Sequence, residues 1–453
     1  MNLRVENLSA RYSPESKTIF EGISFEVKAG EFILLTGLSG SGKSTLLSSL
    51  NGILHGEELV SGSIFLDDTE LSGMGANERS NYIASVLQNA DEQIIFEKVE
   101  DELAFPLENM ALSPEEMRER IQKYAGMMSL RLNDRTSKLS GGQKQSLITA
   151  ASFGMERKIL LFDEPLANLD NRAAVRLLDT LKEFCEKHGY IVLFSEHRID
   201  LVLGYTDRVF YMNAGKLKSI SDKTRFKLYL DNKVSKIKET LVSTCKEPVF
   251  EIDRLQYKVD SKEILKGINY KFLRGGKYVI SGENGTGKTT FIKLLTGINK
   301  PSAGSIRSPF SKKERFQKIG LVMQNPNYQL FMPSVEAELK LQSKDDNFLQ
   351  FLIENFRIGE LLQKHPHSLS EGQKRRVGVA AILSMQPEVL ILDEPSVGQD
   401  YKNMSAMLTA ILELCKINDT TVISISHDLR CFQNLGDIFL KLEDGVLKEN
   451  EVF

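Results

Sequence analysis

The chain has 453 residues, of which 41% are hydrophobic and 26% are charged, and its formal net charge is −3. This composition is typical of a globular protein of several domains, and it excludes collagen-like, low-complexity and wholly disordered chains. The near-neutral charge provides no global field for nucleic acid or an anionic membrane, and no segment approaches the ~20 apolar residues of a membrane-spanning helix. The first residues lack the apolar core of a signal peptide, and the four scattered cysteines predict free thiols in an intracellular protein.

The predicted elements of the first half alternate between strands and helices. Residues 31–35 are an apolar run typical of a buried strand, and a glycine-rich turn and a helix over about 43–54 follow it. A largely helical stretch is expected over about 92–153. Two further apolar runs, at 158–162 and 191–194, are of the kind found in parallel sheets. This order predicts an α/β domain.

The second half repeats the pattern, with apolar runs at 278–280, 389–392 and 422–425. The sequence GLSGSGKST at 37–45 recurs as GENGTGKTT 245 positions later, and LSGGQ at 139–143, DEP at 163–165 and His197 have counterparts 230 positions later. These matches indicate a duplicated domain whose second copy has shorter loops. We predict domains at 1–221 and 248–453, joined by a linker at 222–247. Because acidic residues are mixed with the Lys and Arg of the linker, a solvated connector is favoured over a basic arm for phosphate or membrane.

The glycine-rich turns at 37–44 and 282–289 match the pattern G-x-x-x-x-G-K-[ST]. In such a turn consecutive backbone N–H groups point at phosphate oxygens, and the following helix presents its positive end to the same anion. Lys43 and Lys288 are expected to contact the β- and γ-phosphates, and Ser44 and Thr289 to ligate Mg²⁺. The predicted ATP contacts of the two loops are Gly37, Gly40, Gly42, Lys43, Ser44 and Thr45 in the first copy, and Gly282, Gly285, Gly287, Lys288, Thr289 and Thr290 in the second.

An acidic pair follows one of the apolar runs in each half. The strand is expected to deliver Asp163 to the outer shell of the metal and to leave Glu164 at the γ-phosphate, where it can orient or deprotonate water. Asp393 and Glu394 are expected to do the same in the second half. An acidic pair after a strand is otherwise an ordinary solvated strand end, but its place downstream of a phosphate loop in both halves favours the functional interpretation.

These residues, together with LSGGQ at 139–143, make the chain resemble the ATP-binding cassette (ABC) ATPases over essentially its whole length. The resemblance implies an α/β fold of two tandem P-loop NTPase domains of ABC type, each with a RecA-like core, an antiparallel β subdomain and a helical subdomain. It also implies that the two domains pair head to tail within the chain, with each ATP between the phosphate loop of one domain and the signature of the other. A Ser hydroxyl and Gly N–H groups at a helix start would form that second anion site.

The resemblance implies roles for further residues in both copies. Those implied in catalysis are Gln88, Glu164 and His197, and Gln324, Glu394 and His427. Ligands of Mg²⁺ are implied at Ser44, Gln88, Asp163, Thr289, Gln324 and Asp393. Signature contacts to ATP are implied at Ser140, Gly142, Gln143, Ser370, Gly372 and Gln373. Tyr12 and Tyr257 stand where the family stacks adenine on an aromatic ring, although a core or surface role for either tyrosine stays open.

Both copies keep the Lys, Asp, Glu and His of the family, so two hydrolytically competent sites are predicted. The departures lie elsewhere. Glu371 stands in the second signature where the first has Gly141, and a negative side chain beside a triphosphate is unfavourable unless it points away. Gln399 replaces a Leu that the first copy keeps as Leu169. These differences leave room for unequal rates at the two sites.

The segment after each catalytic glutamine resembles that of the energy-coupling factor (ECF) transporter ATPases. Their pattern is Q-N-P-[DE]-x-Q-[LI]-F followed by V-E-x-[DE]-[VL]-A-F; residues 88–105 match it nearly in full, whereas 324–340 lack the final A-F. In that family the segment forms part of a groove that receives coupling helices of the transmembrane subunit. An ordinary amphipathic helix is the alternative interpretation, and the absence of a helical period in the apolar residues at 94–96 and 330–331 disfavours it.

The ECF resemblance implies an ATP-hydrolysing subunit at the cytoplasmic face of the membrane, with a transmembrane coupling subunit and a substrate-capture subunit as partners, and no nucleic acid. The cargo would be a vitamin, a vitamin precursor or a transition-metal cation; hydroxymethylpyrimidine or thiamine is favoured by analogy with fused twin ATPases. The alternative function is a soluble twin-cassette translation factor acting on the ribosome, which would carry a longer, highly charged connector. A fused sugar importer is disfavoured because its second copy usually has degraded catalytic residues, and DNA-repair cassettes carry zinc cysteines that this chain lacks.

Overall fold

The structure, a computed structural model, describes residues 1–11, 18–53, 58–167, 169–223, 226, 247–259, 262–396, 399–426 and 435–449. It divides into two compact units, Met1–Tyr229 and Leu230–Phe453, which are described separately below. Much of the predicted linker at 222–247 lies outside the described residues. The domain limits taken from the sequence therefore stay a prediction.

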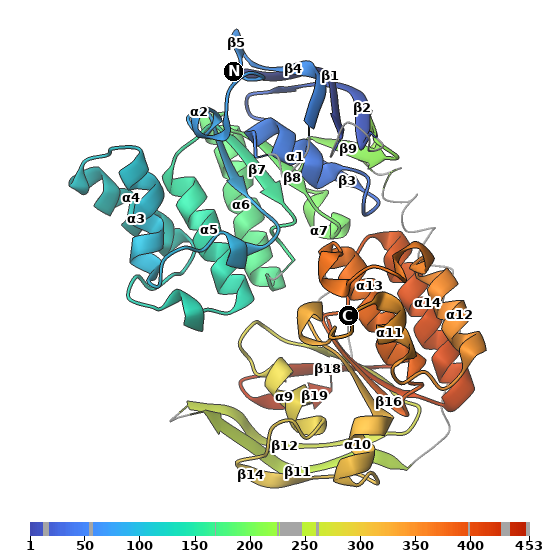
Figure 1. Ribbon diagram of the computed structural model, residues 1–453. Helices are drawn as coiled ribbons and strands as arrows, with labels where there is room; N and C mark the ends of the chain where they lie inside the picture. Colours follow the sequence, from blue (N-terminus) through green and yellow to red (C-terminus); the bar gives the residue numbers. More distant parts are fainter. Residues whose placement is uncertain are drawn as a thin grey trace. The chain divides into compact units, whose positions relative to one another are not determined.

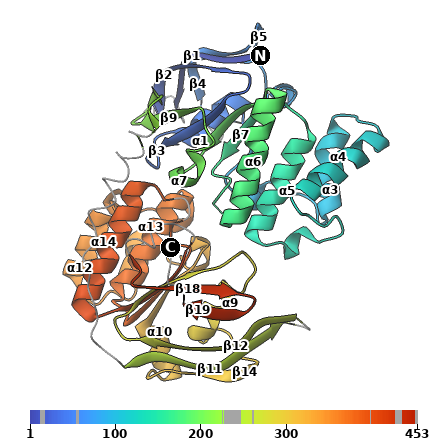
Figure 2. The same ribbon diagram turned by 180° about the vertical axis from the view of Figure 1, so that it is seen from behind.

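A six-stranded sheet forms the centre of the first unit, in the order β10-β9-β3-β8-β7-β6. Its neighbouring strands are parallel except for β9 and β10. Every residue of β3, β7 and β8 is buried, as the apolar runs predict, because helices cover both faces of a parallel sheet. The strands are β3 (Phe32–Gly37), β6 (Ile83–Val86), β7 (Ile159–Asp163), β8 (Ile191–Ser195), β9 (Arg208–Asn213) and β10 (Lys216–Ile220). Helices α1 (Lys43–Asn51) and α6 (Asn171–His188) pack against this sheet (Figures 1 and 2).

Two smaller parts flank the central sheet of the first unit. An antiparallel sheet, in the order β2-β1-β4-β5, lies at one end of the unit, and three helices lie at the other (Figure 1). The strands are β1 (Asn2–Arg11), β2 (Phe20–Lys28), β4 (Glu58–Leu66) and β5 (Thr69–Glu70). The helices are α3 (Val99–Asn109), α4 (Pro114–Met127) and α5 (Gly141–Gly154); shorter turns are α2 (Ala76–Arg79), η1 (Ala90–Glu92), η2 (Thr136–Lys138) and α7 (Ile199–Val202). The predicted core, antiparallel subdomain and helical subdomain are thus confirmed.

The second unit repeats this architecture. Its central sheet has the order β15-β16-β17-β13-β18-β19, and its antiparallel sheet the order β12-β11-β14. The strands are β11 (Pro248–Val259), β12 (Lys262–Leu273), β13 (Lys277–Ser281), β14 (Ala303–Arg307), β15 (Ile319–Val322), β16 (Val389–Asp393), β17 (Thr421–Ile425), β18 (Ile438–Glu443) and β19 (Val446–Glu449). The helices are α9 (Lys288–Leu295), α10 (Lys312–Lys318), α11 (Val335–Lys340), α12 (Asp346–Asn355), α13 (Glu371–Ser384) and α14 (Tyr401–Asn418), with short turns η4 (Pro326–Tyr328), η5 (Gly359–Leu361) and η6 (Pro366–Ser368). The internal repeat of motifs is therefore a repeat of the fold.

The helix after the first phosphate loop is shorter than the sequence predicted. It was expected to reach about residue 54, but α1 ends at Asn51. Gly52 adopts a left-handed conformation with φ of 79°, and its N–H donates to the carbonyl oxygen of Ser48 at 3.0 Å. A glycine in this conformation ends a helix, because it satisfies a carbonyl of the last turn without the steric cost that a Cβ carries.

Two expectations from composition concern the chain as a whole. Within the ranges that the structure describes, no helix combines the length and the apolar character needed to cross a bilayer. Cys185 and Cys415 are buried free thiols, as predicted. Cys245 and Cys431 lie outside the described residues.

An aromatic cluster joins the helical part of the first unit to its central sheet. The ring of Phe153, on α5, lies 6.1 Å from the ring of Tyr124 on α4, 6.2 Å from that of Phe162 on β7 and 5.0 Å from that of Phe184 on α6. Phe153 is only 2% exposed. Because α5 begins at the signature, this cluster also fixes the direction in which the signature leaves the core.

We predict that Phe153→Ala lowers the free energy of unfolding of the first unit by about 3–5 kcal/mol, since it removes buried apolar surface and leaves a cavity. Phe153→Leu is expected to cost clearly less, because it refills most of that volume. Urea denaturation of the full chain, followed by a probe in the first unit, measures both. Equal and small effects of the two substitutions would contradict the assigned packing role.

Candidate active site

Each glycine-rich turn connects a central strand to a helix, as the sequence predicted. β3 leads through its loop into α1, and β13 leads through its loop into α9. A Cβ added to Gly37 would lie 2.0 Å from the carbonyl oxygen of Met212, and one added to Gly282 would lie 2.3 Å from that of Leu442. The first position of each loop therefore admits only glycine, because the neighbouring strand approaches its backbone too closely for a side chain.

The lysine of each loop is buried and its ammonium group turns back over the loop. Lys43 Nζ donates to the carbonyl oxygen of Gly37 at 3.1 Å and to that of Leu38 at 3.3 Å. Lys288 makes the two equivalent contacts with its own loop, at 2.5 and 2.9 Å. A buried cation at a helix N-terminus favours a nearby anion, so both loops have the electrostatics of a phosphate site.

The donor atoms around the first loop fit a nucleotide with its metal. The Oγ of Ser41 is buried and has no hydrogen-bond partner among the described residues, so it is available to a phosphate oxygen. Ser44 and Asp163 bring hydroxyl and carboxylate oxygens together, which are the ligands that Mg²⁺ prefers. In the second unit Thr289 Oγ1 donates to Asp393 Oδ2 at 3.1 Å, which places the same pair of ligand types side by side.

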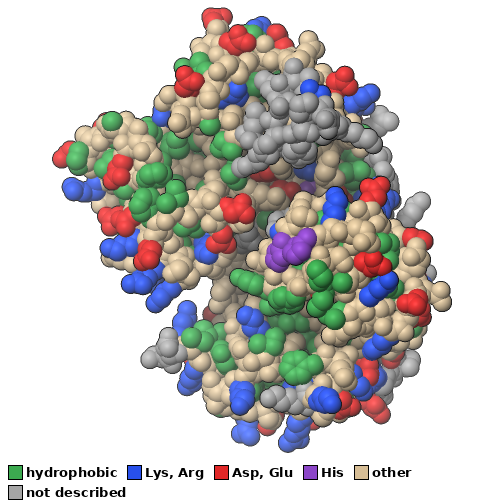
Figure 3. Space-filling view, viewed as in Figure 1, with side chains coloured by type: hydrophobic (Ala, Val, Ile, Leu, Met, Phe, Trp, Pro, Cys, Tyr) green, Lys and Arg blue, Asp and Glu red, His purple; other side chains and the backbone are tan. Residues whose placement is uncertain are grey.

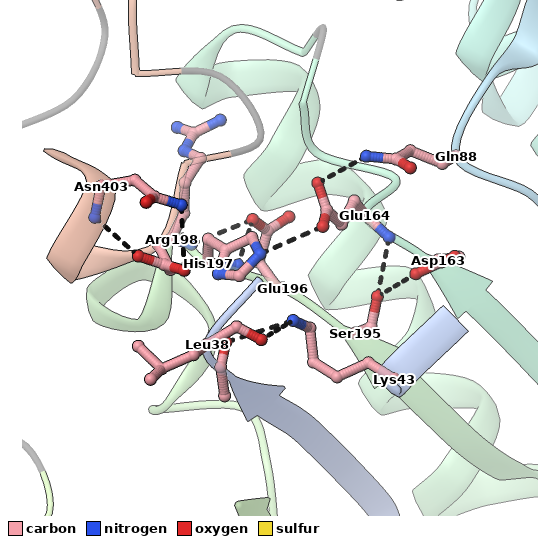
Figure 4. A network of polar contacts seen from close by, with 12 residues as sticks. Leu38, Lys43, Gln88, Asp163, Glu164, Ser195, Glu196, His197, Arg198 and Asn403 are labelled. Carbon is pink, nitrogen blue, oxygen red and sulfur yellow. Dashed lines mark hydrogen bonds and ion pairs between the residues drawn. The ribbon is translucent and has the colours of Figure 1, made fainter. Parts of the chain in front are cut away.

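The acidic pair of the first unit lies at the end of β7, in contact with residues from two other strand ends (Figure 4). Glu164 Oε2 accepts a hydrogen bond from Gln88 Nε2 at 3.0 Å, and Glu164 Oε1 lies 3.1 Å from His197 Nε2. Ser195 Oγ donates to Asp163 Oδ1 at 2.5 Å. The structure therefore brings together four residues that the sequence predicted from three separate motifs.

The two carboxyl groups of this pair differ in their electrostatic environment. Burial and the neighbouring Glu164 raise the pKa of Asp163, and the hydrogen bonds from Ser195 and Ser44 only partly oppose this. Burial also opposes ionisation of Glu164, but His197, Lys43 and Gln88 together outweigh it and hold the pKa of this carboxyl below its usual range. One member of the pair thus stays ionised, while the other gains most from a bound cation.

Both glutamates of the acidic pairs, which the sequence predicts to be catalytic, have a strained backbone. Glu164 has φ of 48° and Glu394 has φ of 49°, in the left-handed region that residues with a Cβ rarely adopt. Such a conformation costs about 1–3 kcal/mol and persists where the surroundings enforce it. The N–H of Glu164 donates to the carbonyl oxygen of Ser195 at 3.1 Å, and that of Glu394 to the carbonyl oxygen of Ile425 at 2.9 Å. The same backbone anchor therefore turns the carboxylate out of the strand in both units.

The second acidic site repeats the first only in part within the described residues. Burial raises the pKa of Asp393, against the hydrogen bond from Thr289 and the charge of Lys288. At the corresponding strand end the second unit has Ile425 in place of Ser195. An isoleucine side chain cannot donate the hydrogen bond that Ser195 donates to Asp163. His427 lies outside the described residues, and its place in the site stays a prediction.

The signature serine of each unit caps the helix that follows it. Ser140 Oγ accepts from the N–H of Gln143 at 3.3 Å, and Gln143 Oε1 accepts from the N–H of Ser140 at 2.9 Å, at the start of α5. Ser370 and Gln373 form the same capping box at the start of α13, at 3.4 and 3.0 Å. The box satisfies the backbone N–H groups of the serine and of the glutamine, and so fixes where the helix begins. The contacts of the signature with ATP stay a prediction.

The structure describes one of the two tyrosines that the resemblance assigns to adenine stacking. Tyr12 lies outside the described residues. Tyr257 is half-buried on β11, packs against the core of the second unit, and its hydroxyl accepts from Asn299 Nδ2 at 3.3 Å. These contacts are compatible with a core role as well as with a platform for a base, so both interpretations stay open.

Sequence reasoning missed three groups at these sites. Ser195 and Glu196 precede His197 and contact Asp163 and the histidine backbone respectively. In the second unit Arg375 joins two backbone carbonyls of the predicted active site. Only the position of Ser195 and Glu196, next to a predicted catalytic histidine at a strand end, could have indicated them.

Comparison with known proteins gives the family of the chain. The family model described as "ABC transporter" matches residues 20–167 and 265–397. The chain is 32% identical to "Putative HMP/thiamine import ATP-binding protein YkoD" of Bacillus subtilis, over 98% of this chain and 90% of the relative. It is also 32% identical to a Treponema denticola protein that is named as an ABC transporter ATP-binding protein, over 99% and 96% of the two chains.

Among solved structures, a protein titled "RNase-L Inhibitor" has the same fold, with a TM-score of 0.72 over 98% of this chain and 90% of that chain, at 22% identity. Its similarity extends over both units, which agrees with the duplicated architecture. At this identity it supports the fold alone. The duplicated phosphate loops, the acidic strand ends and the family matches in both halves lead to one conclusion: the chain belongs to the ABC transporter family, as an ATPase with two tandem ATP-binding domains.

Proposed function

We propose that the chain is the ATP-hydrolysing subunit of an ECF-type importer, peripheral at the cytoplasmic face of the membrane. Separate transmembrane coupling and substrate-capture subunits would complete the importer, and no nucleic acid would take part. The observation that carries the proposal is a loop, present in both units, that presents an exposed apolar side chain seven positions after the predicted catalytic glutamine. The two domains, at 1–221 and 248–453, would pair within the chain around two ATP molecules.

The docking loop is defined here as residues 88–96 in the first unit and 324–332 in the second. Ile95 and Phe331 each stand at the seventh position after the catalytic glutamine of their unit. They are 67% and 73% exposed, the highest values among the large apolar side chains described in each unit. Apolar side chains also gather on the visible face of the second unit in Figure 3. One exposed apolar side chain is ordinary on a protein surface, so the support for an interface is that both units present one at the same position of the loop.

Three hydrogen bonds hold the docking loop of the first unit. Gln93 Oε1 accepts from the N–H of Leu87 at 2.8 Å. Glu102 is buried on α3, and its Oε2 accepts from the N–H groups of Ile95 at 2.9 Å and Phe96 at 2.8 Å. Because the carboxylate satisfies these backbone donors from inside, the side chain of Ile95 is left facing solvent.

The second unit holds its docking loop in the same way. Gln329 Oε1 accepts from the N–H of Met323 at 2.8 Å. Glu338 Oε2 accepts from the N–H groups of Phe331 and Met332, both at 2.8 Å. The loop conformation thus survives although most of its other side chains differ. This supports a shared role for the two loops, namely contact with the transmembrane coupling subunit.

ATP would be held by the phosphate loops, with Lys43 and Lys288 on the terminal phosphates. Bound Mg²⁺ supplies charge neutralisation at the phosphates, and Ser44, Asp163, Thr289 and Asp393 are its proposed ligands, with Gln88 and Gln324 beside them. Gly40, Gly42, Thr45, Gly285, Gly287 and Thr290 complete the predicted loop contacts. Ser140, Gly142 and Gln143, and Ser370, Gly372 and Gln373, would cover the nucleotide of the other domain.

Glu164 would orient the attacking water rather than remove its proton outright. A carboxylate whose pKa lies below its usual range is a weak base but a good fixed acceptor. His197 and Gln88 hold its two oxygens, so the carboxylate has one defined direction. Glu394, His427 and Gln324 are proposed to act in the same roles in the second site.

The cargo is proposed as a vitamin, a vitamin precursor such as hydroxymethylpyrimidine or thiamine, or a transition-metal cation. The name of the Bacillus subtilis relative supports the hydroxymethylpyrimidine or thiamine assignment. The alternative function, a soluble translation factor acting on the ribosome, predicts co-sedimentation with ribosomes that high salt reverses. Co-purification from detergent extracts with a small membrane protein supports the importer, and ATP hydrolysis that no membrane partner alters would count against it.

We predict that Glu164→Gln and Glu394→Gln each remove turnover at one site, so that each single variant keeps roughly half of the steady-state ATPase rate. The double variant should lose a hundredfold or more, since both water-orienting groups are gone. Phosphate release by the purified full chain measures the rates, and ATP binding serves as the control because Gln preserves the shape of Glu. Near-total loss in both single variants would contradict independent sites, and no loss in either would refute the role of the glutamates.

We predict that Ile95→Asp and Phe331→Asp weaken co-purification with the membrane subunits at least tenfold, because a charge replaces the apolar contact. The ATPase rate of the purified chain should stay unchanged. Ile298→Asp is the matched control, since Ile298 is 55% exposed in the second unit but lies outside the docking loop. Wild-type recovery of the membrane subunits with both loop variants would argue against the docking role.

A further inference from the structure

A buried glutamate precedes the catalytic histidine of the first unit. Glu196 is 3% exposed, and its backbone N–H donates to the carbonyl oxygen of Leu35, on the strand that leads into the phosphate loop, at 3.3 Å. Its Oε1 accepts from the N–H groups of His197 at 2.7 Å and Arg198 at 2.9 Å. Its Oε2 is buried and has no hydrogen-bond partner in the part of the chain that the structure describes. A single carboxylate oxygen thus fixes the backbone that carries the histidine (Figure 4).

Arg198, two residues after Glu196, ties this backbone to the segment that follows Glu164. Arg198 Nη1 donates to the carbonyl oxygens of Leu166 at 3.2 Å and Leu169 at 3.1 Å. Its Nη2 donates to Asn171 Oδ1 at 2.5 Å. The planar guanidinium can hold several acceptors in one geometry, which a flexible ammonium group does less well. The segment that carries His197 is therefore joined to the segment that follows Glu164 by the hydrogen bonds of Arg198, in addition to the direct contact between the His197 and Glu164 side chains.

We propose that Glu196 and Arg198 are positioning residues that hold His197 against Glu164, so that turnover at the first nucleotide site depends on them and turnover at the second does not. The inference rests on the roles proposed above for Glu164 and His197. The His197 Nε2 and Glu164 Oε1 atoms are 3.1 Å apart, and a displacement of about 1 Å in such a contact is enough to lower a rate strongly.

The second unit has side chains of different chemistry at these two places. Ser426 and Asp428 stand 230 positions after Glu196 and Arg198, the same interval that relates the two histidines. A serine has a shorter side chain than glutamate, and an aspartate has no N–H group to donate to carbonyl oxygens. The hydrogen bonds that Arg198 donates therefore have no counterpart in the second sequence, and Ser426 offers a shorter acceptor than Glu196.

A different side chain holds the active-site backbone of the second unit. Arg375 donates from Nη1 to the carbonyl oxygen of Glu394 at 2.8 Å and from Nη2 to that of Gln324 at 2.6 Å. The first unit has Gln145 at the corresponding position, and the Nε2 of this buried side chain has no partner among the described residues. The arginine of the first unit thus supports the histidine segment, whereas that of the second supports the backbones of Glu394 and Gln324.

The brace of the first unit needs an acceptor oxygen rather than a charge. Burial raises the pKa of Glu196, and Glu164 adds to this rise, against the lowering effects of Arg198 and His197. Glutamine has the same length and keeps an acceptor oxygen. Glu196→Gln therefore separates loss of charge from loss of the two hydrogen bonds.

The test uses the full chain carrying Glu394→Gln, in which only the first site turns over, and the full chain carrying Glu164→Gln, in which only the second does. In the first of these, Glu196→Ser and Arg198→Asp are expected to lower kcat about ten- to a hundredfold, while the Kd for ATP changes less than about twofold. Glu196→Gln is expected to keep the rate. In the second chain, all three substitutions should leave kcat within about twofold, which a general loss of folding would not do.

Four results would overturn the inference: equal losses in both chains, no loss in the Glu394→Gln chain, a Glu196→Gln variant as slow as Glu196→Ser, or a Glu394→Gln chain that is silent before any further change. The last result would mean that the first site does not turn over by itself. If adding Glu164→Gln to the Glu394→Gln chain left the rate unchanged, that result would instead refute the role proposed for Glu164.

Discussion

The active site of each unit depends on the convergence of neighbouring parallel strands at one edge of the central sheet. In the first unit β3, β8, β7 and β6 are adjacent, and they lead in turn to the phosphate loop, His197, the acidic pair and Gln88. Parallel strands end at the same edge, so groups from distant parts of the sequence meet there without long loops. The order β13-β17-β16-β15 provides the same edge in the second unit.

At this edge of the sheet, charged side chains are buried together. Lys43, Asp163 and Glu164 are all at most 8% exposed, so each is stable only because the others, or a ligand, compensate it. The left-handed backbone of Glu164 adds local strain, which the sheet around it supports. The fold thus holds a buried group of charged side chains in position to bind a nucleotide, and this lowers the local stability.

The duplicated scaffold carries two different sets of supporting contacts. Glu102 and Glu338 hold the two docking loops by the same hydrogen bonds, so this part of the design is shared. The contacts around the predicted catalytic groups differ, because Arg198 ties the histidine segment in one unit, and Arg375 ties the backbones of Glu394 and Gln324 in the other. The side chains that are predicted to contact ATP occur in the sequence of both copies, whereas the residues that support them differ.

The sequence by itself determined the α/β fold, the duplication, and the motifs at the strand ends, because glycine-rich turns, apolar runs and acidic pairs are local patterns with local physical causes. It also indicated that residues 94–96 are not helical. Its helix over 43–54 was too long, since the stop at Gly52 needs only one left-handed residue. Only the tertiary structure decided that Gln88 and His197 hold the two oxygens of Glu164, and that Glu196 and Arg198 lie behind them. Those contacts depend on which strands are neighbours in the sheet, and no local pattern in the sequence encodes that order.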